Sequence, residues 1–156
     1  MPSDRAFAAS TVAVGLVALA HAAFTWPTAA VLAFFGGGAA IAFVAEAAVV
    51  DAGWLEHHVG PKLLGVPLYV LFGWTGAVYV AFRAALLVTE GWPAVALAAV
   101  LATGYDVLVD HRGVAEGHWT YTDSLPGPRV RDVPWWNFAG WLAISAATAG
   151  LANVVL

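Results

Sequence analysis

Five long apolar runs divide this 156-residue chain, and each is close to the length that a helix needs to cross a membrane. About 20 apolar residues span the ~30 Å hydrocarbon layer of a bilayer as an α-helix. Segments with Gly, Pro and charged residues separate the runs. The predicted membrane helices are residues 6–24, 28–50, 63–82, 93–109 and 135–155.

The composition supports lipid as the solvent for this chain. Apolar residues make up 62% of it and charged residues only 10%, with a mean hydropathy of +0.81. Soluble domains carry about 45–50% apolar and about 25% charged residues. We therefore predict an all-α integral membrane helical bundle of about five transmembrane helices, forming a single transmembrane domain over residues 1–156. No internal repeat is evident in the sequence.

Charge and cysteine content exclude several functions. The formal net charge of −4 leaves no basic surface for DNA or RNA, so we expect no nucleic-acid partner. The chain has no cysteine, and therefore no disulfide and no thiolate nucleophile. Ala20, His21 and Ala22 imitate a signal-peptide cleavage site, but a second apolar run follows closely, which favours a helical hairpin.

The basic residues predict the orientation in the membrane. If five helices alternate in direction, the N-terminus and the two long loops share one side. That side carries Arg5, Lys62, Arg112, Arg129 and Arg131, whereas the other side carries only Arg83. The positive-inside rule then predicts a multi-pass cell-membrane protein with a cytoplasmic N-terminus, cytoplasmic long loops and the C-terminus outside.

Three acids fall inside or at the edge of the apolar runs. Glu46 lies in the second run, and Asp106 and Asp110 lie one helical turn apart in and after the fourth. Intramembrane carboxylates usually face a cavity or a partner, and the alternation of helices places all three in the same half of the bilayer. Burial and mutual repulsion disfavour ionisation of all three, so we expect a neutral proton donor beside an anionic acceptor.

Histidines and aromatic residues gather in the same loops. A metal site built from His57 or His58 with His111, His118 and a carboxylate is conceivable, but no pair has ligand spacing, and we predict no metal. The aromatic residues suggest either a belt at the lipid headgroups or a pocket that shelters a cation. Asn137, which lies among them, provides an amide that can hold a water or a hydroxyl.

Three motifs occur in order along the chain. They are Gly60-Pro61-Lys62-Leu63-Leu64-Gly65-Val66-Pro67, then Asp106-x-x-x-Asp110 followed by Gly117-x-Trp119-x-Tyr121, and then Val133-Pro134-x-x-Asn137-Phe138-x-Gly140-Trp141. With Glu46 upstream, they resemble the carotenoid hydratase family of membrane proteins, which includes hydratases of halophilic archaea and of bacteria. Two features differ from that family: His111 replaces a proline, and a shorter segment precedes Gly60. Arginine in excess of lysine is typical of a salt-loving archaeon.

The resemblance implies that water is added across the terminal isopropylidene double bond of a long carotenoid, without a redox cofactor. It implies Asp106 as the acid, Asp110 or Glu46 as the group that orients water, and Asn137 as a positioning residue. The implied substrate-binding residues are Trp54, Lys62, Trp119, Tyr121, Trp135, Trp136, Phe138 and Trp141. Expected partners are the carotenoid, membrane lipid and a homo-oligomer or larger biosynthetic complex.

A non-catalytic carotenoid-binding or assembly subunit is the alternative. Members of the family extend further beyond the Asn137-Phe138 motif than this chain does. A small proton-coupled transporter is a third interpretation. The lack of an evident repeated half argues against it.

Overall fold

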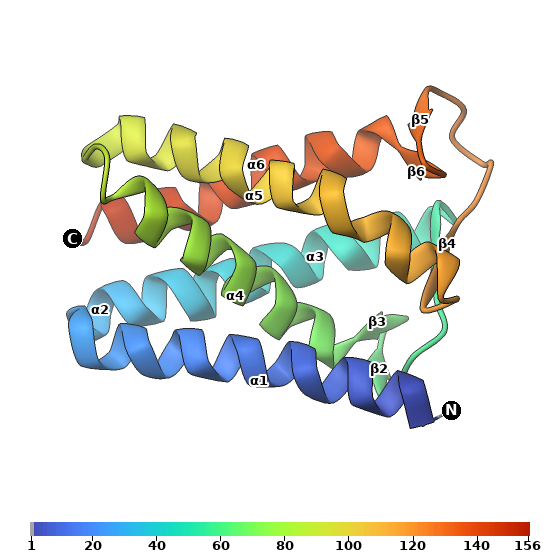
Figure 1. The fold of residues 1–156 in the computed structure, drawn as a ribbon, viewed down its shortest axis with the longest axis horizontal. Helices are drawn as coiled ribbons and strands as arrows, with labels where there is room; N and C mark the ends of the chain where they lie inside the picture. The colour runs from blue at the N-terminus through green and yellow to red at the C-terminus, as the bar shows by residue number, and fades with distance from the viewer. Residues whose placement is uncertain (1) are drawn as a thin grey trace.

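The structure is a computed structural model that describes the backbone of residues 2–156 and the side chains of residues 4–156. Within this range five helical rods lie along one long axis (Figure 1). The rods are α1 (Pro2–Thr25), the continuous stretch of α2 (Thr28–Val31), η1 (Leu32–Gly37) and α3 (Gly38–Asp51), α4 (Leu68–Ala85), α5 (Gly91–Ala115) and α6 (Trp135–Asn153). The chain is an all-α membrane bundle, as predicted.

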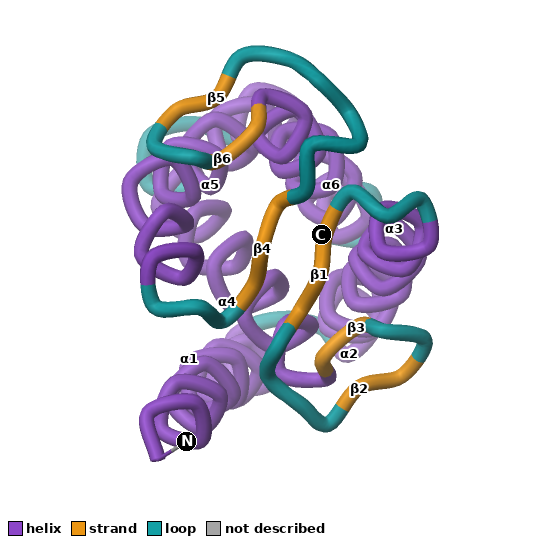
Figure 2. The backbone as a smooth tube through the Cα atoms, turned by 90° about the vertical axis from the view of Figure 1, so that its right-hand side faces the viewer, coloured by secondary structure: helices purple, strands orange, loops and turns teal. Residues whose placement is uncertain are grey.

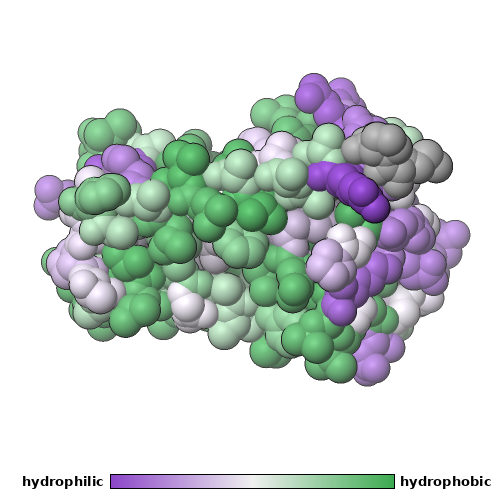
Figure 3. Space-filling view, turned by 90° about the horizontal axis from the view of Figure 1, so that it is seen from below, coloured by the Kyte–Doolittle hydropathy of each residue, from purple (hydrophilic) through white to green (hydrophobic). Residues whose placement is uncertain are grey.

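Four of the rods in the described residues are long and apolar enough to cross a membrane. They are Asp4–Thr25, Thr28–Asp51, Leu68–Ala85 and Gly91–Ala115. The 19-residue α6 packs along α5. Apolar side chains cover the middle of the surface, while hydrophilic ones gather mainly at the end near the N-terminus (Figure 3). That end also holds every strand, and the C-terminus lies at the opposite end (Figure 1).

Two predicted helix boundaries differ most from the structure. The third helix begins at Leu68 rather than at residue 63, because Leu64 and Gly65 take left-handed φ angles of 49° and 80° in a tight hairpin. Pro67 follows as the N-cap, so its missing N–H costs the helix nothing. The fourth helix continues beyond residue 109 to Ala115, and Asp110 is therefore a helical residue.

Three short antiparallel strand pairs, which the sequence analysis did not predict, close the N-terminal end of the bundle (Figure 2). β1 (Leu55–His57) pairs with β4 (Trp119–Tyr121) across the centre. β2 (Lys62–Leu63) pairs with β3 (Val66–Pro67). β5 (Arg129–Val130) pairs with β6 (Val133–Pro134). Each loop thus consists of one central strand and one hairpin.

The two loops and their flanking helices form an internal repeat, so the expectation of no repeat is wrong. We call residues 38–85 (α3 to α4) the first unit and residues 91–153 (α5 to α6) the second unit. Both helices that precede a loop end before a left-handed glycine, Gly53 at φ 71° and Gly117 at φ 75°. Both hairpins follow the pattern Gly-Pro-(Lys/Arg)-x-x-x-Val-Pro, and both lead to Gly-Trp six residues after the second proline.

Backbone hydrogen bonds obey the same symmetry. The His58 amide donates to the His118 carbonyl at 2.9 Å, and the Thr122 amide donates to the Trp54 carbonyl at 3.0 Å. A two-fold rotation that superposes the two units exchanges these two hydrogen bonds. The same rotation exchanges β1 with β4 and leaves their pairing register unchanged. The units run in the same direction, so the rotation axis lies along the bundle, as in parallel repeats of membrane proteins.

Candidate active site

A cavity of about 390 Å³ lies at the strand end of the bundle, where the two repeat units meet. Glu46 from α3 and Asp106 and Asp110 from α5 all line it. All three acids are buried, with Asp106 only 2% exposed. The structure therefore brings together the three carboxyl groups that the sequence singles out, although 60 residues separate Glu46 from Asp106.

Asp106 is the most deeply buried of these acids. Asn137 Nδ2, from the first turn of α6, donates a hydrogen bond of 2.7 Å to Asp106 Oδ2. An amide N–H fixes that oxygen as an acceptor and leaves Oδ1 as the oxygen able to carry a proton. The Asn137 amide oxygen also remains available to a ligand.

Glu46 and Asp110 occupy equivalent positions in the two repeat units. Glu46 Oε2 lies 3.1 Å from His57 Nε2, and Asp110 Oδ2 accepts a 2.9 Å hydrogen bond from the Tyr121 hydroxyl. In both cases the partner lies on the central strand, eleven residues after the acid. Glu46 Oε1 also accepts the Trp74 indole N–H at 3.0 Å, so both oxygens of Glu46 are engaged.

Tyr121, on β4, is held in its neutral form. Burial raises its pKa well above the ordinary value of 10, and the nearby Asp110 and Asp106 raise it further. The hydroxyl therefore keeps its proton and remains a donor to Asp110 over the whole physiological pH range.

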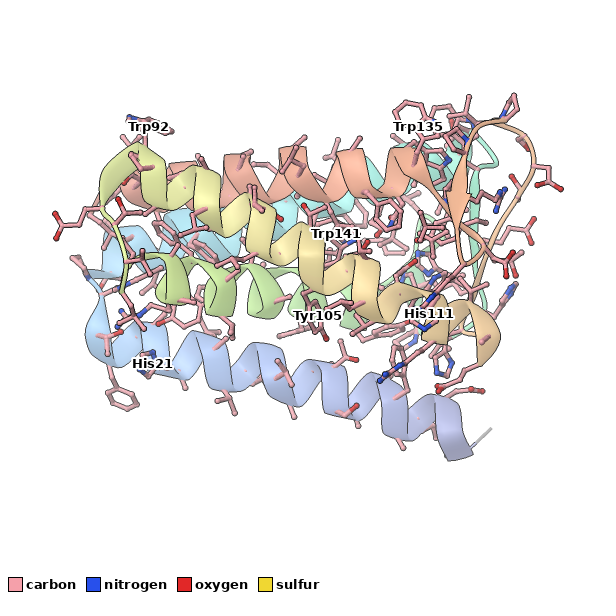
Figure 4. All side chains as sticks on the ribbon, turned by 45° about the horizontal axis from the view of Figure 1, so that its top comes forward. His21, Trp92, Tyr105, His111, Trp135 and Trp141 are labelled. Carbon is pink, nitrogen blue, oxygen red and sulfur yellow. The ribbon has the colours of Figure 1, made fainter. Side chains whose placement is uncertain are left out.

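Aromatic faces form the walls of the cavity. The Trp74 and Trp141 rings, at equivalent positions in the two units, stack with centroids 3.7 Å apart. Trp119 lies against Gly113, where a Cβ would fall 2.0 Å from its ring, so no larger residue fits there. Tyr105 points from α5 towards α1 (Figure 4). Such π-faces stabilise a neighbouring cation.

Three buried polar atoms of cavity-lining residues have no hydrogen bond of normal geometry among the described residues. They are the Tyr69 hydroxyl, His57 Nδ1 and Trp119 Nε1, and the Trp119 side chain lies close enough to Asp110 to act on it as a hydrogen-bond donor. Buried polar groups are normally satisfied, so unpaired polar atoms at a cavity indicate where water or a ligand oxygen binds.

The other predicted substrate-binding residues are distributed unevenly. Trp119, Tyr121 and Trp141 line the cavity. The remaining five, Trp54, Lys62, Trp135, Trp136 and Phe138, do not line it. The Trp54 and Trp136 rings pack 5.6 Å apart above it, Lys62 Nζ donates to the His57 carbonyl, and Trp135 projects outward at the end of the bundle (Figure 4).

His57, Trp74 and Tyr69 line the cavity but were not predicted as active-site residues. The first two bind Glu46 directly. The internal repeat was the signal that would have found Trp74, because it places Trp74 opposite the predicted Trp141.

The described histidines are not grouped in a way that could hold a metal ion. Among the described side chains, no three His, Asp or Glu groups lie close enough together to hold a metal ion. His118 stacks on Phe7 with centroids 4.0 Å apart, and the exposed His58 bonds Thr120.

Fold and site together define a multi-pass membrane protein with an acidic, aromatic-walled cavity at one end. The family model described as carotenoid biosynthesis protein matches residues 7–156, which is nearly the whole chain. The chain therefore belongs to the carotenoid biosynthesis protein family. No curated protein and no solved structure gives a significant match. The repeat removes the sequence argument against a transporter, but the family assignment points to biosynthesis.

Proposed function

We propose that this protein adds water across the terminal isopropylidene double bond of a long carotenoid by acid catalysis. One observation carries the proposal: three buried carboxyl groups from two helices line a single aromatic-walled cavity in a chain of the carotenoid biosynthesis family. The reaction needs a proton donor, an acceptor for a water proton, and shelter for a tertiary carbocation, and the cavity holds a candidate for each.

Asp106 is the proposed acid. It transfers its proton to the less substituted alkene carbon, and the electron pair of the double bond forms the new C–H bond. Its Oδ2 is held by Asn137, so Oδ1 presents the proton. The tertiary carbocation that results lies beside the stacked pair of Trp74 and Trp141, where the outer face of one of these rings stabilises it.

Asp110 is the proposed acceptor. Its Oδ2 is held by the Tyr121 hydroxyl, and its other oxygen is left to orient a water molecule. The water oxygen bonds to the cationic carbon, and the surplus proton passes to Asp110. Asp106 lies one helical turn away, so transfer of this proton back to Asp106 completes the net addition of one water.

Glu46 has a different role in this proposal. Both of its oxygens are already engaged, Oε1 by the Trp74 N–H that it accepts and Oε2 by the His57 ring nitrogen 3.1 Å away. A fixed carboxylate in this place stabilises the positive charge of the transition state without taking a proton.

We further propose that the strand end of the bundle faces the cytoplasm, with the C-terminus outside the cell membrane. The basic residues favour this orientation under the positive-inside rule. Water then enters from the side where the acids lie, and the carotenoid enters from the lipid. Oligomers or larger biosynthetic complexes fit the same arrangement.

The decisive experiment combines the purified chain, in lipid, with a carotenoid that ends in an isopropylidene group. We expect a product heavier by one water, and loss of that product in Asp106→Asn. Full activity of Asp106→Asn would overturn the assignment of the acid. Purified protein that retains the carotenoid with an unaltered end group, and never forms product, would instead support the non-catalytic binding subunit.

A further inference from the structure

The acidic cavity is too small for the whole of the proposed substrate, and this inference rests on that proposed function. Its volume of about 390 Å³ falls near the lower limit for pockets that hold drug-sized ligands. A carotenoid is a long, stiff and apolar chain. Only its reacting end fits beside Asp106, and the rest of the polyene must lie elsewhere on the protein or in the lipid.

A second cavity, of about 500 Å³, lies between α1 and α4. On α1, Thr11 lines the acidic cavity and Val14, one turn later, lines the second. On α4, Ala77 lines the acidic cavity and Val80, one turn later, lines the second. Residues three apart on a helix are neighbours on one face, so the two cavities adjoin on both helices.

We call the strip lined by Thr11, Val14, Val17, Ala77 and Val80 the lateral groove. Three of these side chains are open to lipid, with Val14 54%, Val17 70% and Val80 60% exposed. Tyr105, which lines the acidic cavity, is itself 53% exposed. An apolar molecule can therefore enter the groove sideways from the bilayer.

Glycines bring α1 and α4 into close contact beside the groove. Gly15 of α1 meets Gly76 of α4 so closely that a Cβ on Gly76 would lie 3.1 Å from the Gly15 Cα. A Cβ on Gly73 would lie 2.8 Å from the Thr11 methyl group. These contacts hold α1 tightly on α4, and a firmly packed pair of helices gives the groove a fixed floor.

The groove ends at a polar cluster. His21 Nδ1 and the Tyr79 hydroxyl lie 2.7 Å apart, and Arg83 lines the same cavity in the last turn of α4. Arg83 lies ten residues after Gly73, about 15 Å along the helix axis at 1.5 Å per residue. The apolar stretch thus leads from the acidic cavity towards the opposite end of the bundle.

We propose that the lateral groove binds the polyene chain of the substrate whose end group enters the acidic cavity. The neighbouring linings of the two cavities favour this occupant over a lipid acyl chain or a second copy of the protein, because neither of those needs to reach the acids. The groove makes the enzyme selective for long substrates, and Val80 is a specificity-determining residue.

The test compares two tryptophan substitutions in the full chain. Val80→Trp fills the groove. Val100→Trp is the matched control, because Val100 on α5 is 59% exposed, like Val80, and lines neither cavity. Each variant is assayed with a full-length carotenoid and with a truncated alkene that bears the same end group but is too short to reach Val80. The amount of carotenoid retained by each purified variant is measured separately by its visible absorbance.

We expect Val80→Trp to lower the ratio of kcat/KM for the long substrate to that for the short one by about tenfold or more, or at least 1.4 kcal/mol. Retained carotenoid should fall with it, while Val100→Trp changes neither quantity. Val14→Trp gives a second way to fill the groove if Val80→Trp does not fold. An unchanged ratio with unchanged retention would overturn the proposal.

Two further results identify a different occupant. Loss of co-purified phospholipid from Val80→Trp, with carotenoid retention unchanged, would overturn the proposal in favour of an acyl chain. A change of oligomeric state with unchanged retention would overturn it in favour of a second copy. If the wild-type protein hydrates neither substrate, the proposed function is wrong, and carotenoid retention alone then decides whether the groove binds a polyene.

Discussion

The two repeat units build the same frame, but only the second carries the proposed acid, Asp106, and the Asn137 amide that holds it. In each unit a helix presents an acid, a central strand binds it, and a tryptophan on the next helix lines the cavity. Asp106 and Asn137 break this symmetry, because Ala42 and Val70 occupy the equivalent positions in the first unit. The unduplicated pair, the proposed acid and the amide that holds it, therefore distinguishes the reactive side of the cavity.

The largest effect should come from making the second unit resemble the first. In the double variant Asp106→Ala with Asn137→Val, we expect hydration to fall by about a hundred- to ten-thousand-fold, the usual contribution of a general acid. The fold should persist, because the same residues already pack in the first unit, where Ala42 is 1% exposed. Product mass measures the first effect and thermal unfolding in detergent the second. Wild-type activity in this variant would show that the asymmetry has no chemical meaning.

The equivalent acids Glu46 and Asp110 should differ in importance. We expect Asp110→Asn to slow hydration by about a hundredfold or more, because it removes the proposed proton acceptor. Glu46→Gln should slow it about tenfold, because Glu46 contributes only charge. Glu56→Gln, on an exposed residue of β1, is the matched control and should have no effect. Equal losses in the first two variants would mean that the units share the proton-transfer role.

The strand residue Tyr121 provides the next test. Tyr121→Phe removes the hydroxyl that holds Asp110, and we expect about a tenfold loss of rate, because a hydrogen bond to a charged group is worth about 1.5–3 kcal/mol. In the native protein the raised pKa of Tyr121 means that the folded state retains this proton more strongly than the unfolded chain does. Its ionisation therefore lowers stability only above about pH 10.

A pH profile of the wild-type rate checks the assignment of Tyr121. No loss of activity due to this phenol should occur below about pH 10. A fall in rate with rising pH that begins near neutral pH and disappears in Tyr121→Phe would contradict the assignment of a neutral Tyr121.

The helices and the acids were accessible from the sequence for simple physical reasons. Apolar runs of spanning length have few alternatives to a helix in lipid, because every backbone polar group must be satisfied within the segment. Helices that alternate in direction bring Glu46 and Asp106 to the same level of the bilayer, and the cost of burying a carboxyl group makes a shared cavity the expected solution.

The repeat and the strands could not be predicted from the sequence in the same way. Equivalent positions are 64 residues apart up to the central strands but 67 apart in the hairpins, because the second loop is three residues longer. A search for repeats at a single spacing therefore finds the matching residues of the central strands or those of the hairpins, but not both. The strands contain only two or three residues, too few for an alternating pattern. Aromatic residues such as Trp54 were assigned to the substrate because sequence alone does not separate a cavity wall from a nearby ring cluster.

The smallest predicted effect concerns the hairpin cations, Lys62 in the first unit and Arg129 in the second. Lys62 Nζ donates to the carbonyl of His57, and Arg129 Nη1 lies 3.5 Å from the equivalent carbonyl of Tyr121. Arg129 additionally donates to the Thr122 carbonyl and pairs with the exposed Asp123. We expect Lys62→Met to lower the free energy of unfolding by about 0.5–1 kcal/mol and Arg129→Met by about 1–2 kcal/mol, because more hydrogen bonds are lost.

Unfolding of the two variants in a mild detergent measures this difference. Arg131→Met is the control for loss of charge, since the exposed Arg131 of the same hairpin contacts the His111 ring and donates to no backbone carbonyl among the described residues. A larger loss in Lys62→Met would mean that the first hairpin, rather than the second, anchors the central strands. In that result the Lys62 ammonium group supports β1, and with it the contact between His57 and Glu46. In that case the frame of the cavity depends more on the first unit, even though the proposed acid lies in the second.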